Sequence, residues 1–413
     1  MKYDVVIIGG GPAGMIAAGR AGERGARVLL LEKNDRLGVK LLITGHGRCN
    51  ITNKIDSPRE MAEKFGRNGK FLISAFSRFG VREVIGFFES RGVKTKVEKN
   101  NRVIAESDRA EDVLDALIDY MEKAKVEVRS NAEVRSIEKS GNRIEKVVLS
   151  SGEEVFADRF VICTGGKSYP ATGSTGDGFG WAKALGHKVV RPAPSLTPVI
   201  LKDAFVKELE GLSLRDVRIS AYKDNKKFDS GVGEAVFTAK GMSGPLIINM
   251  SKGIGKELPG EVALKIDLVP DLDFTELDAR VRKDLQEGPH RQIKNCLDML
   301  LPQKLVPVIT RIAGIDPGKK ANCITKEERK KLVHLMKEFG VHVAGLPGFE
   351  RAVITAGGVE LGEVDSKTMR SKLIENLYFA GEVLDLDGPT GGYNLQVCWS
   401  TGYCAGEAAA VRP

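Results

Sequence analysis

The sequence predicts an α/β protein with a Rossmann-like nucleotide-binding domain built in two parts. Between the parts, it predicts a β-barrel-like domain and a small helical insertion. Three observations predict this class. A strand, glycine turn, helix and strand follow one another at residues 3–33, and a second glycine-rich strand-to-helix turn occupies 376–410. The chain between them changes from β-rich patterning to helical periodicity and back.

Composition places the chain among ordinary globular proteins. Its 413 residues are 42% hydrophobic and 29% charged, enough for two or three domains. No uninterrupted apolar run reaches about 18 residues, so we expect no membrane span. The first residues read as a strand and not as a signal peptide. Six scattered cysteines without a CxxC pair favour a reducing cytoplasm and predict no metal site.

The charge balance is basic, at +8 with a pI near 9.0. Such a balance is compatible with nucleic acid, with an anionic cofactor or with no specific partner. The densest basic segment, 326–337, alternates acids with bases, which is typical of a solvated helix face. No stripe of Lys and Arg carries interleaved aromatic residues. We therefore expect a small-molecule substrate and no membrane partner; the composition disfavours nucleic acid as a partner without excluding it, and the oligomeric state stays open.

The first glycine motif follows a short apolar run suited to a buried parallel strand. Gly9 permits the tight turn, Gly11 lets the backbone approach a pyrophosphate, and Gly14 lets the helix pack closely on the sheet. Pro12 and Ala13 open that helix, whose free N–H groups and dipole face the phosphates. The full strand–turn–helix context predicts a dinucleotide site.

An acid ends the second strand of this unit. Val28–Leu31 form the strand, and Glu32 follows at about the spacing expected for the ribose-binding residue. A carboxylate there would accept hydrogen bonds from both ribose hydroxyls. Lys33 comes next and is included among the expected cofactor-binding residues.

Two later stretches of the sequence indicate whether the dinucleotide is FAD or NAD. Residues 159–173 form an apolar strand that ends at Thr164 and Gly165. Residues 376–410 form a short strand at Leu377–Ala380, then a turn and a helix rich in small residues. The expected cofactor-binding residues of the second stretch are Gly381, Glu382, Asp385, Gly391, Gly392, Tyr393 and Asn394.

This order is typical of two-part FAD-binding domains. In those domains the acid binds the ribityl chain, and the last helix directs its N-terminal N–H groups at the pyrimidine edge of the flavin. An NAD-only dehydrogenase does not require the chain to return in this way. No second GxGxxG is present, so NADH or NADPH would act only as a transient reductant.

The loop "TGHGRCN" at 44–50 lies in the segment expected beside the pyrophosphate and the flavin ring. Cys49 could be a redox thiol, a covalent attachment point or a small buried filler. His46 could be a base or a loop histidine bonded to backbone. The expected cofactor-binding residues of this segment are Lys40, Leu41, Gly47, Arg48, Cys49 and Asn50.

Several motifs resemble a known family. "GVKLLITGHGRCNITN", "TGGKSYPATGSTGDGF", "FTAKGMSGP" and the stretch from Ile354 through "GPTGGYNLQ" look like the BaiN-like flavoproteins of bacteria, also catalogued as aminoacetone-oxidase-family FAD-binding proteins. The resemblance spans nearly the whole chain. It implies a non-contiguous FAD domain, a barrel-like domain and a helical insertion. One member is associated with reduction of conjugated double bonds in bile-acid intermediates, whereas the amine-oxidase label indicates another substrate.

The resemblance also implies individual roles. It makes Asn131–Val134 the strand whose backbone meets the adenine, which adds Val134 to the cofactor-binding residues. Family members commonly have a histidine after Phe-Thr, whereas this chain has Ala239 and Lys240 after Phe237-Thr238. Any catalytic role of that histidine is absent here, and Lys240 is a candidate substitute.

The remaining patterns set the expected domain limits. The FAD-binding domain is expected at 1–190 and 351–413, the β-barrel-like domain at 191–270 and 338–350, and the helical bundle at 271–337. A further helix should follow the glycine loop at 173–176, with Thr175 or Asp177 as its cap. Gly176 and Asp177 are candidate flavin contacts, with an ordinary capped helix as the alternative.

These observations predict an FAD-dependent oxidoreductase that moves a hydride between flavin N5 and a small organic substrate. The favoured form is an NAD(P)H-driven reductase of a conjugated C=C or carbonyl compound. The alternatives are a peroxide-forming amine oxidase and a non-catalytic flavin sensor or RNA-binding protein. The candidate catalytic residues are Tyr393, Lys240 and Arg48. The expected ring-side residues are Arg48, Asn50, Gly357, Gly358, Gly392, Tyr393 and Asn394.

Overall fold

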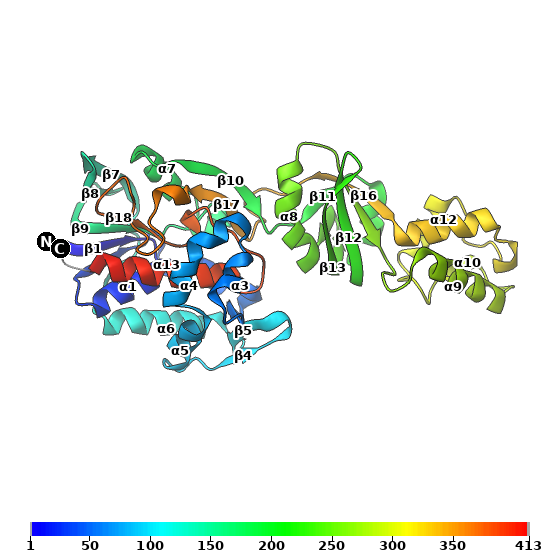
Figure 1. The fold of residues 1–413 in the computed structure, drawn as a ribbon, viewed down its shortest axis with the longest axis horizontal. Coiled ribbons are helices and arrows are strands. Elements are labelled where there is room, and N and C mark those ends of the chain that lie inside the picture. Colours follow the sequence, from blue (N-terminus) through cyan, green and yellow to red (C-terminus); the bar gives the residue numbers. More distant parts are fainter. Residues whose placement is uncertain (1, 411–413) are drawn as a thin grey trace. The chain divides into compact units, whose positions relative to one another are not determined.

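A computed structural model describes residues 2–410 (Figure 1). The chain divides into two compact units. One contains the chain up to Pro194 and from Phe349 onward, and the other spans Ser195–Gly348. The prediction of a Rossmann-like domain in two parts, interrupted by a barrel, is confirmed. The expected end points at residues 1 and 413 lie outside the described residues.

The first unit is built on a seven-stranded sheet in the order β6-β2-β1-β9-β8-β7, with β18 also paired to β9. Five strands run parallel: β1 (Tyr3–Ile8), β2 (Val28–Leu31), β6 (Glu127–Arg129), β9 (Glu154–Ile162) and β18 (Leu377–Phe379). The hairpin of β7 (Val134–Ser140) and β8 (Arg143–Leu149) is antiparallel. Because β18 comes from the second part of the chain, the sheet is complete only after the chain returns.

The glycine motif forms the connection from β1 to α1 (Pro12–Glu23). Gly9 has φ +107°, in the left-handed region that favours glycine. A Cβ on Gly14 would lie 1.9 Å from the carbonyl oxygen of Gly9, so only glycine allows the helix to pack this closely. Pro12 occupies the first helical turn, where its missing N–H costs no hydrogen bond.

Helix α13 (Tyr393–Ala410) packs directly along α1, and Figure 1 shows the two side by side. A Cβ on Gly402 would lie 2.5 Å from the carbonyl oxygen of Ala13, and one on Gly406 would lie 2.3 Å from that of Ala17. Both contacts advance in the same chain direction, so the helices run parallel. Their backbones approach so closely because these positions carry no side chain.

Shorter elements surround this framework. A three-stranded sheet has the order β3-β5-β4, with β3 at Asn50–Asn53, β5 at Arg102–Ala105 and β4 at Thr95–Val97. Strands β10 (Val189–Ser195) and β17 (Ile354–Val359) form a two-stranded sheet. The helices are α2 (Val39–Leu42), α3 (Pro58–Glu63), α4 (Ile73–Arg78), α5 (Val81–Glu89), α6 (Ala110–Lys123) and α7 (Asp177–Ala184).

The second unit contains a closed barrel in the order β11-β14-β13-β12-β15-β16. Alternating buried and exposed residues form its strands, with one face turned to a common core. The strands are β11 (Val199–Leu201), β12 (Ser213–Lys223), β13 (Lys226–Thr238), β14 (Gly241–Ser243), β15 (Val262–Asp267) and β16 (Phe339–Gly345). The barrel-like prediction is confirmed.

The predicted helical insertion lies between β15 and β16 and shares one apolar core with the barrel. Its helices are α9 (Phe274–Glu287), α10 (Ile293–Cys296), α11 (Val306–Ala313) and α12 (Lys326–Lys337). Sequence analysis missed α8 (Pro245–Glu257), because residues 199–270 were expected to be β-rich throughout. Two glycines and two adjacent isoleucines give α8 a weak helical signal.

A second expectation was also wrong. Asn131–Val134 was expected to be a strand, but β7 begins only at Val134 and Asn131 has φ +54°. The backbone amides of this segment still bond to the residues that follow β2. The Ala132 N–H donates to the Glu32 carbonyl, and the Asn131 N–H donates to the Asn34 carbonyl. The segment therefore lies beside Glu32 as a turn and not as a strand.

None of the helices described within residues 2–410 is long and apolar enough to cross a membrane.

The contact between α1 and α13 generates a stability prediction. Gly402→Ala forces a Cβ against the Ala13 carbonyl and should lower the free energy of unfolding by about 1–3 kcal/mol. Gly86→Ala in α5 is the control, because a Cβ there meets no atom within 4 Å. Gly86→Ala should raise stability by about 0.5–1 kcal/mol. Urea unfolding followed by circular dichroism measures both, and equal effects would contradict the close packing.

Candidate functional site

The start of α1 presents free backbone donors to open space. Its N-cap, Gly11, has no side chain to cap the first turn. A Cβ on Gly11 would meet no atom within 4 Å. The first N–H groups of a helix have no intrahelical acceptor and, with the helix dipole, attract anions. This end of α1 therefore suits a phosphate group.

Glu32 lies directly beside this turn, almost fully buried. Its Oε2 accepts a hydrogen bond from the Gly10 N–H at 2.7 Å, and its Oε1 accepts one from the Asn34 N–H at 2.8 Å. The carboxylate thus holds the glycine turn and its own strand end together. Each oxygen keeps a further lone pair for a hydroxyl donor.

Lys33 connects the end of β2 to the start of α7. Its Nζ donates to Thr175 Oγ1 at 2.5 Å and to Asp177 Oδ2 at 2.7 Å. The N-cap of α7 is Gly176, with φ +88° and no side-chain cap, so neither Thr175 nor Asp177 caps the helix as expected. Both side chains instead bind the Lys33 ammonium. Lys33 directly follows Glu32 along the chain.

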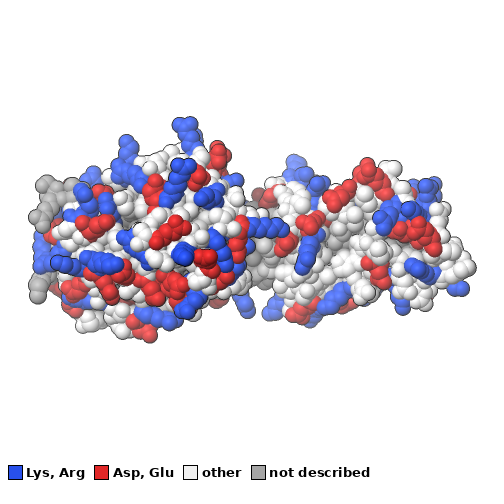
Figure 2. Space-filling model, turned by 90° about the horizontal axis from the view of Figure 1, so that it is seen from below, with Lys and Arg blue, Asp and Glu red and all other residues white. Residues whose placement is uncertain are grey.

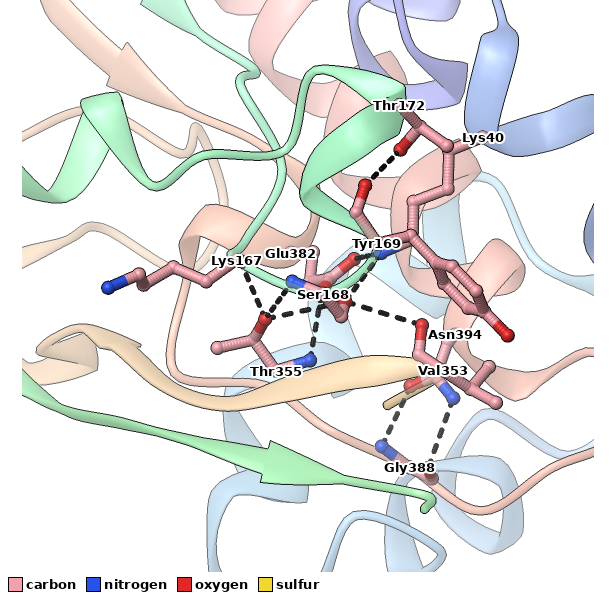
Figure 3. A network of polar contacts seen from close by, with 10 residues as sticks. All are labelled: Lys40, Lys167, Ser168, Tyr169, Thr172, Val353, Thr355, Glu382, Gly388 and Asn394. Carbon is pink, nitrogen blue, oxygen red and sulfur yellow. Dashed lines mark hydrogen bonds and ion pairs between the residues drawn. The ribbon is translucent and has the colours of Figure 1, made fainter. Parts of the chain in front are cut away.

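A polar network joins the two parts of the unit (Figure 3). The carboxylate of Glu382 accepts hydrogen bonds from Lys40 Nζ at 2.8 Å, Ser168 Oγ at 2.9 Å and the Thr355 N–H at 2.8 Å. Lys40 Nζ also donates to Ser168 Oγ at 2.7 Å. Thr355 Oγ1 accepts the backbone N–H groups of Lys167 and Ser168. Three chain segments that are remote in sequence are thereby joined to the half-buried carboxylate of Glu382.

The start of α13 is shaped by glycines and by one asparagine. Gly391 and Gly392 have φ +110° and +100°, and a Cβ on Gly392 would lie 2.3 Å from the carbonyl of Thr52. Asn394 Oδ1 accepts a hydrogen bond from the Gly388 N–H, and its Nδ2 donates to the Gly388 carbonyl (Figure 3). The Nδ2 also donates to the Pro389 carbonyl. Its side chain therefore holds the loop that leads into α13.

The two helix N-termini face the same way along the α1–α13 pair. Since Gly402 packs on Ala13, the start of α1 at Pro12 corresponds to residue 401, and α13 begins eight residues earlier at Tyr393. At 1.5 Å per residue, α13 overshoots α1 by about 12 Å. One elongated ligand can therefore meet both positive helix ends.

The family described as HI0933-like protein Rossmann domain matches residues 3–408. The chain belongs to this family. The resemblance to BaiN-like flavoproteins is confirmed, and the family is one of FAD-binding oxidoreductases.

Three relatives that match over nearly their full length carry two different names. A 3-dehydro-bile acid delta(4,6)-reductase of Clostridium scindens is 31% identical over 411 residues, which cover 98% of this chain and 99% of the relative. A ribosomal RNA dihydrouridine synthase of Escherichia coli is 30% identical over 413 residues, which cover 100% and 99%. A Haemophilus influenzae protein with the second name is 31% identical over 405 residues, covering 97% of each chain.

Solved structures share the fold at low identity. A 3-ketosteroid-delta4-(5alpha)-dehydrogenase of Rhodococcus jostii has a TM-score of 0.55 and 17% identity, and the match covers 100% of this chain and 97% of that one. A flavocytochrome c3 fumarate reductase has a TM-score of 0.53 and 17% identity, covering 99% and 78%. At such identities the likeness concerns the fold.

The residues of this HI0933-like chain fit FAD. The open space before Gly11 and the uncapped first turn of α1 suit the pyrophosphate. Glu32 has lone pairs for ribose hydroxyls, and the start of α13 offers amides to an electron-rich ring edge. Thr164 adds a buried hydroxyl without a partner within residues 2–410. When bound, FAD would supply two-electron hydride chemistry at this site.

The remaining predicted cofactor residues fall at the ends of the same elements. Asp385 is nearly buried, and its Oδ2 accepts a hydrogen bond from Asn68 Nδ2 at 3.0 Å. Gly381 has φ +79°, and a Cβ there would lie 2.8 Å from the Ala13 side chain, which brings the second part onto the first motif. The other predicted positions are the buried Leu41 and Val134, the half-exposed Asn50, and Gly47 and Gly165, both with positive φ.

The three candidate catalytic residues have different surroundings. Arg48 Nη1 lies 3.0 Å from a Glu98 carboxylate oxygen and 3.5 Å from one of Asp108, so ion pairs engage it. Lys240 is exposed in the two-residue turn between β13 and β14, in the barrel unit. Tyr393 is half-buried at the start of α13, and burial raises the pKa of its hydroxyl. Tyr393 thus lies at the start of α13 and carries a hydroxyl, which in a tyrosine is protonated at neutral pH.

The cysteine of the loop at 44–50 is buried inside the protein. Cys49 is fully buried, and this burial raises its pKa to about 12. A thiol with that pKa is almost entirely protonated at neutral pH, which supports the interpretation as a small buried filler. His46 is exposed with φ +59° and has no hydrogen bond to another side chain among the contacts described.

Sequence reasoning missed several residues of the site. Ser168, Thr355 and Asn53 lie within quoted motifs, but only the fold shows that they converge. Asn68 was missed entirely, since it follows an unremarkable charged segment. A buried small polar residue inside a glycine-rich motif is the one signal that points to the first three.

The polar network generates a second stability prediction. Lys40→Met removes the cation that faces the half-buried Glu382 and should lower the free energy of unfolding by about 1–3 kcal/mol. Lys123→Met is the matched control, since it removes an exposed pair with Asp119 and should cost less than about 0.5 kcal/mol. Urea titrations of the wild type and the two variants measure the free energy of unfolding. A loss in Lys40→Met no larger than that in Lys123→Met would refute the stabilising role of the network.

Thiol labelling tests the role of Cys49. At pH 8 an aromatic disulfide reagent should find a single fast-reacting thiol, Cys323, because it is exposed and Cys49 is buried with a raised pKa. Cys323→Ser should abolish the fast phase, whereas Cys49→Ser should leave it intact. Loss of the fast phase in Cys49→Ser would show that Cys49 is accessible and ionised.

Proposed function

We propose that the protein is an FAD-dependent reductase that saturates a carbon–carbon double bond conjugated with a carbonyl group. The observation that carries this proposal is the pair of parallel helices whose N-termini are offset by about 12 Å. One positive end suits the pyrophosphate of FAD, and the other suits the ring edge where negative charge gathers on reduction.

The names of the full-length relatives support the same bond type. A delta(4,6)-reductase acts on double bonds of a 3-dehydro compound, and a dihydrouridine synthase produces uridine with its ring double bond saturated. In both, the double bond lies in conjugation with a carbonyl group. The shared chemistry therefore concerns the bond and not the size of the molecule that carries it.

The reaction balances with residues of this chain. The acceptor gains a hydride at the carbon remote from its carbonyl and a proton at the adjacent carbon. A nicotinamide donor supplies the two electrons and leaves oxidised. The Tyr393 hydroxyl is our candidate for the proton donor, since it lies at the start of α13 and a tyrosine hydroxyl is protonated at neutral pH. When FAD is bound, the first-turn amides of α13 would be the groups of this chain that stabilise negative charge at the ring edge.

A uridine base within ribosomal RNA is a second candidate acceptor. Two relatives that match over nearly the full chain carry that name, and the net charge of +8 is compatible with RNA. Figure 2 shows Lys and Arg interspersed with Asp and Glu over the viewed face, without a stripe of one sign. RNA recognition would therefore rest on a folded RNA shape more than on a basic track.

An anaerobic titration tests the function. The purified protein should carry the yellow band of oxidised flavin, and either NADH or NADPH should bleach it. A steroid 3-oxo-4,6-diene or a uridine-containing ribosomal RNA transcript should then restore the band under anaerobic conditions. The acceptor that restores it fastest identifies the substrate class. Restoration only by oxygen, with peroxide formed, would favour an oxidase and contradict the proposal.

Tyr393→Phe separates the two half-reactions. It should leave bleaching by the nicotinamide unchanged and slow acceptor reduction by about 10²-fold, because only the second step needs its proton. Lys240→Ala is the comparison, since that residue lies exposed in the barrel unit. Equal slowing of both half-reactions in Tyr393→Phe would exclude it as the proton donor.

A further inference from the structure

One buried side chain at the candidate site has an unused acceptor. Asn53 ends β3 and is only 2% exposed. Its Nδ2 donates to the Asn100 carbonyl at 3.0 Å and to the Gly391 carbonyl at 3.1 Å. Its Oδ1 has no partner within residues 2–410. Buried acceptors in folded proteins are nearly always satisfied, so this oxygen calls for a donor from outside the chain.

The orientation of the amide is fixed by its neighbours. Turning the side chain over would place its oxygen against two carbonyl oxygens and its NH₂ group where no acceptor lies. The two donated bonds therefore hold Oδ1 in its position. The missing partner must be an N–H or O–H donor.

The location of Asn53 identifies the kind of donor. The Gly391 carbonyl that it binds lies two residues before α13, and a Cβ on Gly392 would touch the Thr52 backbone. The end of β3 and the start of α13 thus form one surface, with an acceptor from Asn53 and amide donors from the helix. This surface complements a group with an N–H between carbonyl oxygens, which is the imide edge of a flavin ring and also of uracil.

We propose that Asn53 Oδ1 accepts a hydrogen bond from the imide N–H of the bound flavin ring and so positions that ring against α13. The inference rests on the FAD of the proposed function. Asn53 is a positioning residue, because the imide is remote from the atom that carries the hydride. Its role is to select a ring with an intact imide N–H and to fix its rotation about the sugar-alcohol chain.

The test compares FAD with 3-methyl-FAD, in which a methyl group replaces the imide hydrogen. Dissociation constants are measured with apoprotein by the change in flavin fluorescence. The wild-type protein should bind 3-methyl-FAD at least about 10-fold more weakly than FAD, because a buried acceptor loses its donor. In Asn53→Ala the ratio should fall below about 3-fold. FAD carrying chlorine at position 8 is the control, and Asn53→Ala should not change its ratio to FAD.

Each outcome decides the proposal. Equal binding of FAD and 3-methyl-FAD by the wild-type protein overturns it, and needs no variant to fold. An unchanged ratio in a folded Asn53→Ala protein overturns it as well. If wild-type protein discriminates uridine from 3-methyluridine in RNA but not the two flavins, the imide belongs to the substrate and the flavin assignment is wrong.

The same measurements distinguish a failure of the imide contact from a failure of the proposed reductase function. Protein that binds no FAD at all would refute the cofactor and with it both proposals. Protein that discriminates the flavins but reduces no conjugated acceptor would refute only the proposed reaction. The proposed hydrogen bond from the flavin imide to Asn53 would then remain supported.

Discussion

The close parallel packing of α1 on α13 is the contact on which the rest of the site depends. Two glycines of α13 lie against backbone carbonyls of α1, and no residue with a side chain can replace them without displacing a helix. This packing sets how far one N-terminus stands beyond the other. The two termini that we propose for the pyrophosphate and the ring of FAD both belong to this pair, so their spacing is a property of the helix pair and not of any loop.

Around that pair, the unit uses carboxylates to join segments that are remote in sequence. Glu32 fixes the glycine turn to the second strand, and Glu382 draws Lys40, Ser168 and Thr355 together. Both acids are expected cofactor ligands by pattern, yet in the structure each also satisfies backbone or side-chain donors of the protein. The candidate cofactor site is therefore held together by its own acids, and we expect a change of either acid to affect stability and FAD binding together.

Local chemistry explains what could be predicted from sequence. The strand, the glycine turn, the helix and Glu32 were foreseeable because their geometry is dictated within some thirty residues by turn sterics and helix packing. The return of the chain near Leu377 was foreseeable for the same reason. Helix α8 was not, since its glycines and isoleucines weaken the helical pattern.

The finer features of the site depend on contacts that sequence spacing does not contain. Neither Thr175 nor Asp177 caps α7, because Gly176 occupies the N-cap position and both side chains instead contact Lys33. Arg48 forms ion pairs with Glu98 and Asp108, two acids that the motif gave no reason to expect, and its contact with the flavin stays a prediction. Asn53 stood in a quoted motif without a role until the start of α13 was found beside it.

The separation of Ala13 and Gly402 along the chain also bears on how the protein folds. The small-residue face of α1 forms early in the sequence, and its partner surface is synthesised almost four hundred residues later. Contacts of such high sequence separation are slow to form, because a long loop must be closed first. Until then the first unit has an unpaired sheet edge and an uncovered helix face, both of which favour association with other chains. All strands of the barrel unit lie in one continuous segment, so it is under no such constraint. It can fold before α13, which completes the first unit, has been synthesised.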